Sequence, residues 1–177
     1  MIASDIHGSA FYCAKMLEAY KKENVERLLL LGDILYHGPR NDLPEGYNPK
    51  EVIAMLNPLA DELICVRGNC DTEVDQMVLD FPALAEYAIL YLDGRVIFAT
   101  HGHNLNPANP PKIKKGDILL NGHTHIPAFE ETESFIYVNP GSVSIPKDGS
   151  EHGYLLLDGN TLEWKNFEGE VYMSENI

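Results

Sequence analysis

The sequence has few basic residues and no long apolar run. Its 13 Lys and Arg residues stand against 27 Asp and Glu, which gives a formal net charge of -14 at pH 7. A protein that holds nucleic acid by its phosphates needs a basic surface, so stable nucleic-acid binding is not expected. No stretch reaches the roughly 18 apolar residues of a membrane helix, and no basic region precedes an apolar one at the N-terminus. We therefore expect a cytoplasmic protein without membrane association.

Cysteine is also scarce. Only Cys13, Cys65 and Cys70 are present, and no two of them have the Cys-x-x-Cys spacing of a structural zinc site. An odd number of cysteines does not indicate a disulfide framework, and reduced thiols fit the cytoplasm. With 45% hydrophobic and 23% charged residues, the composition is that of an ordinary globular protein. At this length we expect one domain spanning 1–177.

Apolar runs alternate with two helical patterns in the first half and form closely spaced strands in the second, which predicts an α/β protein. In the predicted helix 9–23, Phe11, Ala14 and Leu17 recur at helical spacing and are expected to face the core. A second helix is predicted over 50–59. Strands are expected at 27–31, 62–66, 87–92, 96–100, 118–121, 128–131, 135–139, 154–158 and 162–167.

Polar residues that can bind metals directly follow five of the apolar runs. In an open α/β sheet, functional sites lie outside the carboxyl ends of the strands, so these clusters could form one site. Residues two apart in an extended segment point to the same side, so paired ligands could face one cleft. The clusters are Asp5-Ile6-His7, Gly32-Asp33, Gly68-Asn69-Cys70-Asp71, His101-Gly102-His103 and Gly122-His123-Thr124-His125.

Oxygen and nitrogen ligands without thiolate suit manganese, iron, zinc or nickel better than copper(I) or an iron–sulfur cluster. The candidates are too many for one tetrahedral ion, but they suffice for two ions that share a carboxylate. Asp33 is the expected bridge, because its two oxygens could each bind one ion. Such a pair of ions would attract a phosphate and activate a water molecule. The candidate ligands are Asp5, His7, Asp33, Asn69, His101, His123 and His125.

Each motif alone has a simpler interpretation. Asp5 could cap the following helix, and an isolated Gly-Asp pair is a common turn. The histidine clusters are more specific, because five of the seven histidines lie in them. Of the other two, His152 is expected at the surface. For His37, a substrate contact and a structural role both stay open, and Arg40 and Asn41 of the same loop are candidate substrate contacts.

The order of these clusters resembles that of the calcineurin-like metallophosphoesterase superfamily. Three further motifs look like those of its small single-domain phosphodiesterases of the YfcE type: Gly38-Pro39-Arg40-Asn41, Leu43-Pro44-Glu45-Gly46-Tyr47 and Asn139-Pro140-Gly141-Ser142. The resemblance implies a four-layer α/β/β/α sandwich that hydrolyses a small-molecule phosphodiester (EC 3.1.4.-) and could form a homodimer. It also implies two divalent ions, most often manganese. One ion would be held by Asp5, His7, Asp33 and His125, and the other by Asp33, Asn69, His101 and His123.

Two departures from the family pattern have consequences. Many members have a histidine after the motif asparagine to protonate the leaving group, whereas this chain has Cys70, as the YfcE type does. Strong monoesterase activity is therefore not expected, and His103 becomes the other candidate proton donor. The first strand has only about three residues before Asp5, so the start of the sequence is expected to be incomplete or wrongly assigned.

Three alternative functions fit the residues less well. A retromer-type scaffold subunit shares the fold but has damaged metal positions, and here all seven are intact. Phosphomonoesterases, protein phosphatases and dinucleotide-polyphosphate hydrolases usually have histidine where Cys70 stands. A metallo-β-lactamase needs His-x-His-x-Asp-His, and here Asn104 and Leu105 follow His103.

Overall fold

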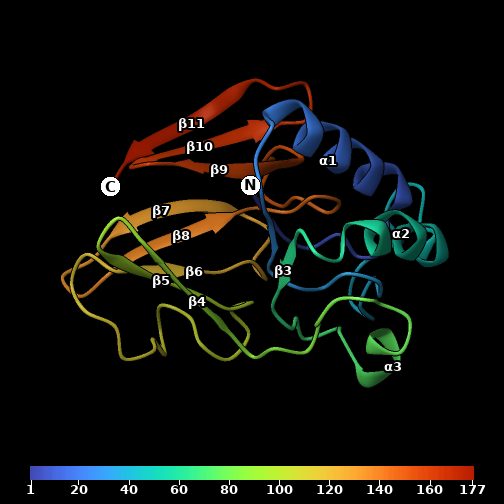
Figure 1. Cartoon of the computed structure of the whole chain (residues 1–177), viewed down its shortest axis with the longest axis horizontal. Helices are drawn as coiled ribbons and strands as arrows, with labels where there is room; N and C mark the ends of the chain where they lie inside the picture. Colours follow the sequence, from blue (N-terminus) through green and yellow to red (C-terminus); the bar gives the residue numbers. More distant parts are fainter.

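Eleven strands and three α-helices make up the computed structural model, which describes residues 1–177 (Figure 1). The helices are α1 (Ala10–Glu23), α2 (Pro49–Leu56), which continues into a 3-10 turn (Asn57–Leu59), and α3 (Glu73–Gln76). The strands are β1 (Ile2–Ala3), β2 (Leu28–Leu30), β3 (Leu63–Cys65), β4 (Ala88–Leu92), β5 (Arg95–Ala99), β6 (Ile118–Leu120), β7 (Pro127–Glu131), β8 (Ile136–Pro140), β9 (Gly153–Asp158), β10 (Thr161–Asn166) and β11 (Val171–Asn176).

The strands form two mixed sheets that pack face to face (Figure 1). The first sheet has the order β11-β10-β9-β1-β2-β3, and the second has the order β4-β5-β6-β8-β7. In the first sheet β1, β2 and β3 are parallel, and β9, β10 and β11 extend it in antiparallel fashion. In the second sheet β5, β6 and β8 are parallel, with β4 and β7 as antiparallel edges. The parallel strands of each sheet therefore end at one common edge.

The alternation of side chains along β2 shows how the core is divided. Leu28 and Leu30 belong to a cluster of 22 buried residues that also includes residues of α1 and α2. Leu29 belongs to a second cluster of 13 buried residues contributed by both sheets. Because neighbouring side chains of a strand point to opposite faces, the first sheet packs on the helices on one side and on the second sheet on the other.

The outer face of the second sheet is covered differently. Phe98 and Leu119 belong to a small buried cluster there, and Leu105 and Ile113 from the connection between β5 and β6 pack against it. This connection contains no helix. The predicted α/β sandwich is confirmed, and loop rather than helix forms its layer on this side.

The predicted elements agree closely with the structure. Both helices are present, and every predicted strand is found with its ends shifted by at most one residue. Two elements were not predicted, the short helix α3 and the edge strand β11. No helix has the length and apolar character that a membrane crossing requires.

Two local expectations were wrong. Phe11 is 41% exposed and lies under the Lys15 ammonium group, because the buried face of α1 instead runs through Ala10, Cys13, Met16, Leu17 and Tyr20. His152 was expected at the surface but is half-buried, because its ring stacks on Tyr12 with 3.9 Å between ring centroids.

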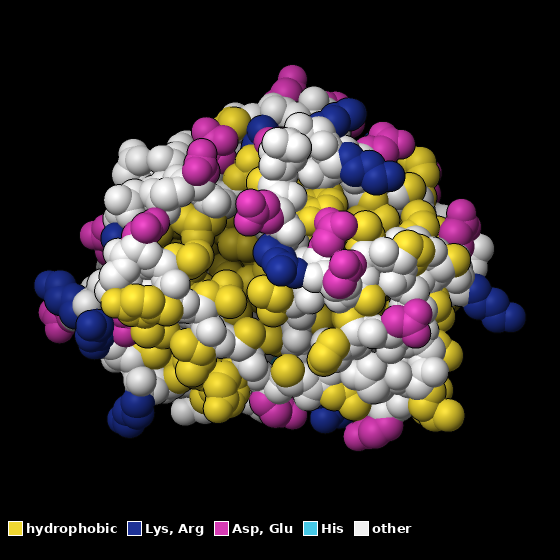
Figure 2. Space-filling view, in the orientation of Figure 1, with side chains coloured by type: hydrophobic (Ala, Val, Ile, Leu, Met, Phe, Trp, Pro, Cys, Tyr) yellow, Lys and Arg dark blue, Asp and Glu magenta, His cyan; other side chains and the backbone are white.

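One face of the molecule has an apolar hollow (Figure 2). A cavity of about 130 Å³ opens between β1, β2 and β3 of the first sheet and β4, β5 and β6 of the second. Nine of its ten lining residues are apolar. The core between the sheets therefore reaches the surface here.

Candidate metal centre

The structure brings the five polar clusters together. They follow the carboxyl ends of β1, β2, β3, β5 and β6, and backbone hydrogen bonds join their loops. The His7 amide donates to the Asp33 carbonyl at 2.8 Å, and the Gly122 amide donates to the His101 carbonyl at 2.8 Å. These loops are thus fixed to one another as well as to their strands.

The backbone of the loops is unusual. Five candidate ligands have left-handed backbone, with φ of 60° at Asp5, 48° at His7, 55° at Asp33, 66° at His123 and 63° at His125. The expectation that paired ligands share a side because the chain is extended was therefore wrong. The side chains converge because each loop curls sharply just after its strand, at a cost of roughly 1–2 kcal/mol per residue.

Two glycines allow the loops to approach the carboxylates. A Cβ atom at Gly68 would overlap the backbone and carboxylate of Asp33, and one at Gly122 would overlap Ser4 and lie 2.9 Å from an oxygen of Asp5. Any side chain at these positions would push a candidate ligand aside.

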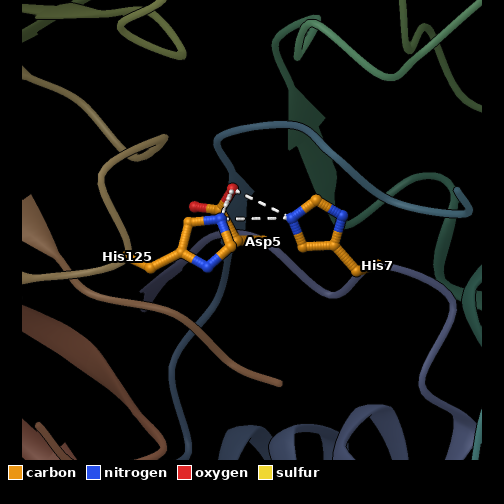
Figure 3. Close-up of side chains that lie close together, drawn as sticks. All are labelled: Asp5, His7 and His125. Atoms are coloured by element: carbon orange, nitrogen blue, oxygen red, sulfur yellow. Dashed lines mark hydrogen bonds and ion pairs between the residues drawn. The ribbon is translucent and has the colours of Figure 1, made fainter. Parts of the chain in front are cut away.

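Asp5, His7 and His125 form the first half of the centre (Figure 3). The Nε2 atoms of the two histidines are 3.2 Å apart, and they lie 3.6 Å and 3.3 Å from Oδ1 of Asp5. The Nδ1 atoms lie 2.8 Å from the Tyr36 carbonyl and 2.6 Å from the Ile145 carbonyl. A carbonyl only accepts hydrogen bonds, so Nδ1 carries a proton in both rings and Nε2 is the nitrogen that could bind a metal.

The three ligand atoms face one another directly. Oδ1 of Asp5 is buried without a hydrogen-bond donor, and Asp5 is 0% exposed. Ligand atoms bound about 2.1 Å from a tetrahedral cation lie roughly 3.4 Å apart, which matches the 3.2–3.6 Å separations here. The three side chains therefore have the spacing that a bound metal ion requires.

His101 is at the centre of the second half. Its Nε2 lies 3.1 Å from Oδ1 of Asn69, 3.2 Å from Nδ1 of His123 and 3.5 Å from Oδ2 of Asp33. Its Nδ1 lies 2.7 Å from the Leu31 carbonyl, so Nδ1 carries a proton and Nε2 is the nitrogen directed at the other candidate ligands. Three candidate ligand atoms thus lie within 3.5 Å of this nitrogen.

Asp33 connects the two halves through one oxygen. Its Oδ2 lies 3.6 Å from Nε2 of His7 and 3.5 Å from Nε2 of His101. Its Oδ1 instead accepts a hydrogen bond from the Cys70 amide at 2.8 Å. The expectation that each oxygen faces one ion is therefore wrong, because Oδ2 alone faces both halves.

The electrostatics of the cluster favour positive charge. Burial alone would raise the pKa of Asp5, but His125 and His7 outweigh it and hold this pKa well below its usual value. Burial alone would lower the pKa of His101, but Asp33 and Asp5 outweigh it and raise this pKa to about 9. Two buried carboxylates thus stabilise any cation placed among these rings.

Asp71 joins two of the loops, a role that the sequence did not reveal. Its buried carboxylate accepts hydrogen bonds from the amides of Asp33 at 2.8 Å, Ile34 at 2.9 Å and Gly68 at 2.7 Å. It therefore fixes the loop that carries Asp33 against the loop that carries Asn69. The only sequence signal was its place in the Gly-Asn-Cys-Asp motif.

The Asp71→Asn variant is expected to bind manganese about 10- to 100-fold more weakly, the usual effect of losing a partner that orients ligands. An amide group offers one acceptor oxygen, so it cannot satisfy all three backbone donors. Calorimetric titration with Mn²⁺ measures the change, with Asp80→Asn, at an exposed site, as the control. Equal affinities in both folded variants would contradict this role.

A polar cavity of about 450 Å³ lies over the cluster. Arg40 and Asn41 line it, but His37 does not, because its ring packs edge-on against Tyr36 and Tyr47. Two residues that the sequence did not single out, Thr124 and Lys147, also line it. The full lining is His7, Asp33, Gly38, Pro39, Arg40, Asn41, Asn69, Cys70, His123, Thr124, His125 and Lys147.

The two candidate proton donors lie in different places. Cys70 lines the cavity, and burial, followed by the charge of Asp33, raises the pKa of its thiol. His103 lies beside the cluster, with its ring centroid 5.5 Å from that of His101 and 6.3 Å from that of His123. Burial and the charge of His101 lower the pKa of His103.

The chain resembles known phosphoesterases throughout this region. Residues 1–161 match the family model of the calcineurin-like phosphoesterase superfamily domain. Phosphodiesterase YfcE of Escherichia coli (strain K12) is 48% identical over 162 residues, covering 92% of this chain and 88% of the relative. The solved structure of YfcE, described as a phosphoesterase from E. coli, superposes with a TM-score of 0.97 at 44% identity and covers 100% and 98% of the two chains.

A more distant structure shares the fold alone. Vacuolar protein sorting 29 from Cryptosporidium parvum has a TM-score of 0.60 at 17% identity, covering 99% of this chain and 96% of that one. The family match and the high identity to YfcE extend over the loops that carry the candidate ligands. By these measures the chain belongs to the calcineurin-like phosphoesterase superfamily.

Proposed function

We propose that this chain is a phosphodiesterase that uses two divalent metal ions, manganese first among them, to hydrolyse a small-molecule phosphodiester. The observation that carries the proposal is the convergence of buried histidine Nε2 atoms and carboxylate oxygens at the spacing of metal ligands. The family implies divalent metal cofactors, and the residues present fit them. The preference for a diester is supported by the name of the 48% identical relative, a phosphodiesterase.

The ligands divide between the two ions around Asp33. Its Oδ2 lies near ring nitrogens of both halves, so it is the residue placed to bind both ions. Asp5, His7 and His125 would complete one site, and Asn69, His101 and His123 would complete the other.

The chain orients these ligands before any substrate arrives. Each carboxylate uses one oxygen for the backbone: Oδ2 of Asp5 accepts from the His123 amide at 3.1 Å, and Oδ1 of Asp33 accepts from the Cys70 amide at 2.8 Å. The remaining oxygen of each faces the centre. When bound, two divalent ions would lower the pKa of a shared water molecule and offset the charge of the phosphate.

A substrate screen tests the proposal. The purified, metal-stripped protein is assayed on bis(4-nitrophenyl) phosphate and on 4-nitrophenyl phosphate, with manganese, nickel, zinc and magnesium added separately. We expect metal-dependent hydrolysis of the diester that is faster than that of the monoester. Hydrolysis by none of the loaded proteins, or faster hydrolysis of the monoester, would refute the assignment.

The leaving-group step gives a further prediction. His103→Ala is expected to slow an alkyl diester by about 10² to 10⁴ and an aryl diester much less, because only an alkoxide needs a positioned acid. Cys70→Ala should change the aryl rate by less than about threefold, because a buried thiol with a raised pKa is a poor proton donor. Steady-state kinetics at saturating manganese measures both variants. If Cys70→Ala abolished activity while its metal content stayed normal, this division of roles would be wrong.

A further inference from the structure

The cavity over the candidate metal centre has two basic side chains that the chemistry described above does not use. Arg40 and Lys147 both line it, and both are exposed. Lys and Arg side chains form three ion pairs with Asp or Glu in this structure, and neither of these two takes part. The chain has 27 acidic and 13 basic residues, and acidic side chains are spread over the surface (Figure 2). The cavity therefore carries two unpaired positive side chains, although the net charge of the molecule is negative.

Hydrogen bonds hold the segments that carry both cations. Next to Arg40, the Asn41 side chain donates to the His37 carbonyl at 2.8 Å. The Lys147 amide donates to the His125 carbonyl at 3.2 Å, and the Ser150 hydroxyl donates to the Lys147 carbonyl at 2.7 Å. Lys147 is thus tied directly to the turn of a candidate metal ligand.

The rest of the lining narrows the chemistry of the occupant. Asp33 is the only acidic residue among the twelve that line the cavity, and its carboxylate faces the metal centre. No Phe, Tyr or Trp lines the cavity, so it offers no platform on which a nucleobase could stack. Its volume of about 450 Å³ lies in the lower half of the range typical of small-ligand sites. The lining suits a small, polar and negatively charged group.

We propose that Arg40 and Lys147 form an anion subsite for the ester arm that the substrate keeps, and that this arm carries a carboxylate or a second phosphate. The proposal rests on the phosphodiesterase function proposed above. In the reaction, a water oxygen bonds to phosphorus and the bond from phosphorus to the leaving alcohol breaks. The departing oxygen takes up the proton that the water releases, and the anionic arm stays on the phosphate monoester product, within reach of the two cations.

The test uses 4-nitrophenyl phosphodiesters with one leaving group and different retained arms. The n-propyl arm is neutral and the choline arm is cationic. The 3-hydroxypropanoate and 3-phosphopropyl arms are anionic. For the manganese-loaded full chain, we expect kcat/KM to be roughly tenfold higher for the preferred anionic arm than for the propyl arm, and lowest for choline. Because exposed ion pairs are weak and screened, the preference should shrink in 0.5 M NaCl. The two anionic arms show which oxyanion the subsite prefers.

Three variants test which side chains cause the preference for an anionic arm. Arg40→Gln and Lys147→Gln should each reduce the ratio of kcat/KM for the anionic arm to kcat/KM for the propyl arm about threefold, mainly through the KM of the anionic ester. Lys115→Gln removes an exposed charge that does not line the cavity and should change nothing. Equal kcat/KM for propyl and anionic arms in the parent, or an equal loss in Lys115→Gln, would overturn the subsite while leaving the phosphodiesterase function intact. Hydrolysis of none of the four esters would overturn both.

Discussion

The Asp33→Asn variant is expected to retain less than about 0.1% of the parent kcat/KM for an aryl phosphodiester, a loss of roughly 4 kcal/mol of transition-state stabilisation. The reason is that Oδ2 of Asp33 lies within 3.6 Å of ring nitrogens in both halves of the centre. An amide keeps the shape of the side chain and removes its charge, so the fold should persist. Steady-state kinetics with manganese saturating gives the loss, and Asp42→Asn, at an exposed position in the loop before α2, is the matched control.

Metal content separates Asp33 from the other ligands. Asp33→Asn should lose metal from both sites, whereas His125→Ala should lose chiefly one ion, because His125 contacts only the half that contains Asp5 and His7. Elemental analysis of the reconstituted variants measures this difference. Comparable losses in the two variants would contradict a bridging role for Asp33.

Stripping the metals with EDTA is expected to reduce hydrolysis to background, and adding manganese should restore it with two ions per chain. Stripping the metals should also lower the melting temperature. A ligand at a hundred times its Kd stabilises the folded state by about 2.7 kcal/mol, so two filled sites would contribute roughly 5 kcal/mol. For a chain of this length that corresponds to a shift of about 10 °C or more.

Calorimetry and elemental analysis of the same sample measure this effect. Asp33→Asn is the variant to compare with the parent, because manganese should raise its melting temperature much less. One ion or none per reconstituted chain, or a melting temperature that manganese does not change, would contradict the two-metal centre.

Much of the fold could be predicted because its elements have clear local signals. Leu28–Leu30 of β2 is buried on both faces and is therefore a continuous apolar run. The edge strand β11 (Val171–Asn176) has no such run, since its residues are half-buried or exposed, and it forms by pairing with β10. The face of α1 was misjudged because small residues such as Ala10 and Cys13 form the buried stripe while Phe11 points outward.

The candidate site could be predicted as a set of residues, but its geometry could not. His7 and His123 directly follow β1 and β6, and their place just after apolar runs is visible in the sequence. The left-handed backbone at these residues is not encoded in a local pattern, because histidine and aspartate are compatible with many conformations. The role of Asp71 and the position of Lys147 at the cavity depend on contacts between loops distant in sequence, which a single sequence does not show.

The left-handed loops also bear on how the sequence of such a protein changes over time. Five of the seven proposed ligands have a left-handed backbone conformation, in which glycine would be less strained. Selection for folding alone would therefore not preserve Asp or His there. A lineage released from catalysis could lose these side chains early and keep its sandwich. The fold match to vacuolar protein sorting 29 at 17% identity shows that the architecture tolerates extensive substitution. In relatives that retain all five residues, we therefore expect that selection has acted on metal binding rather than on folding.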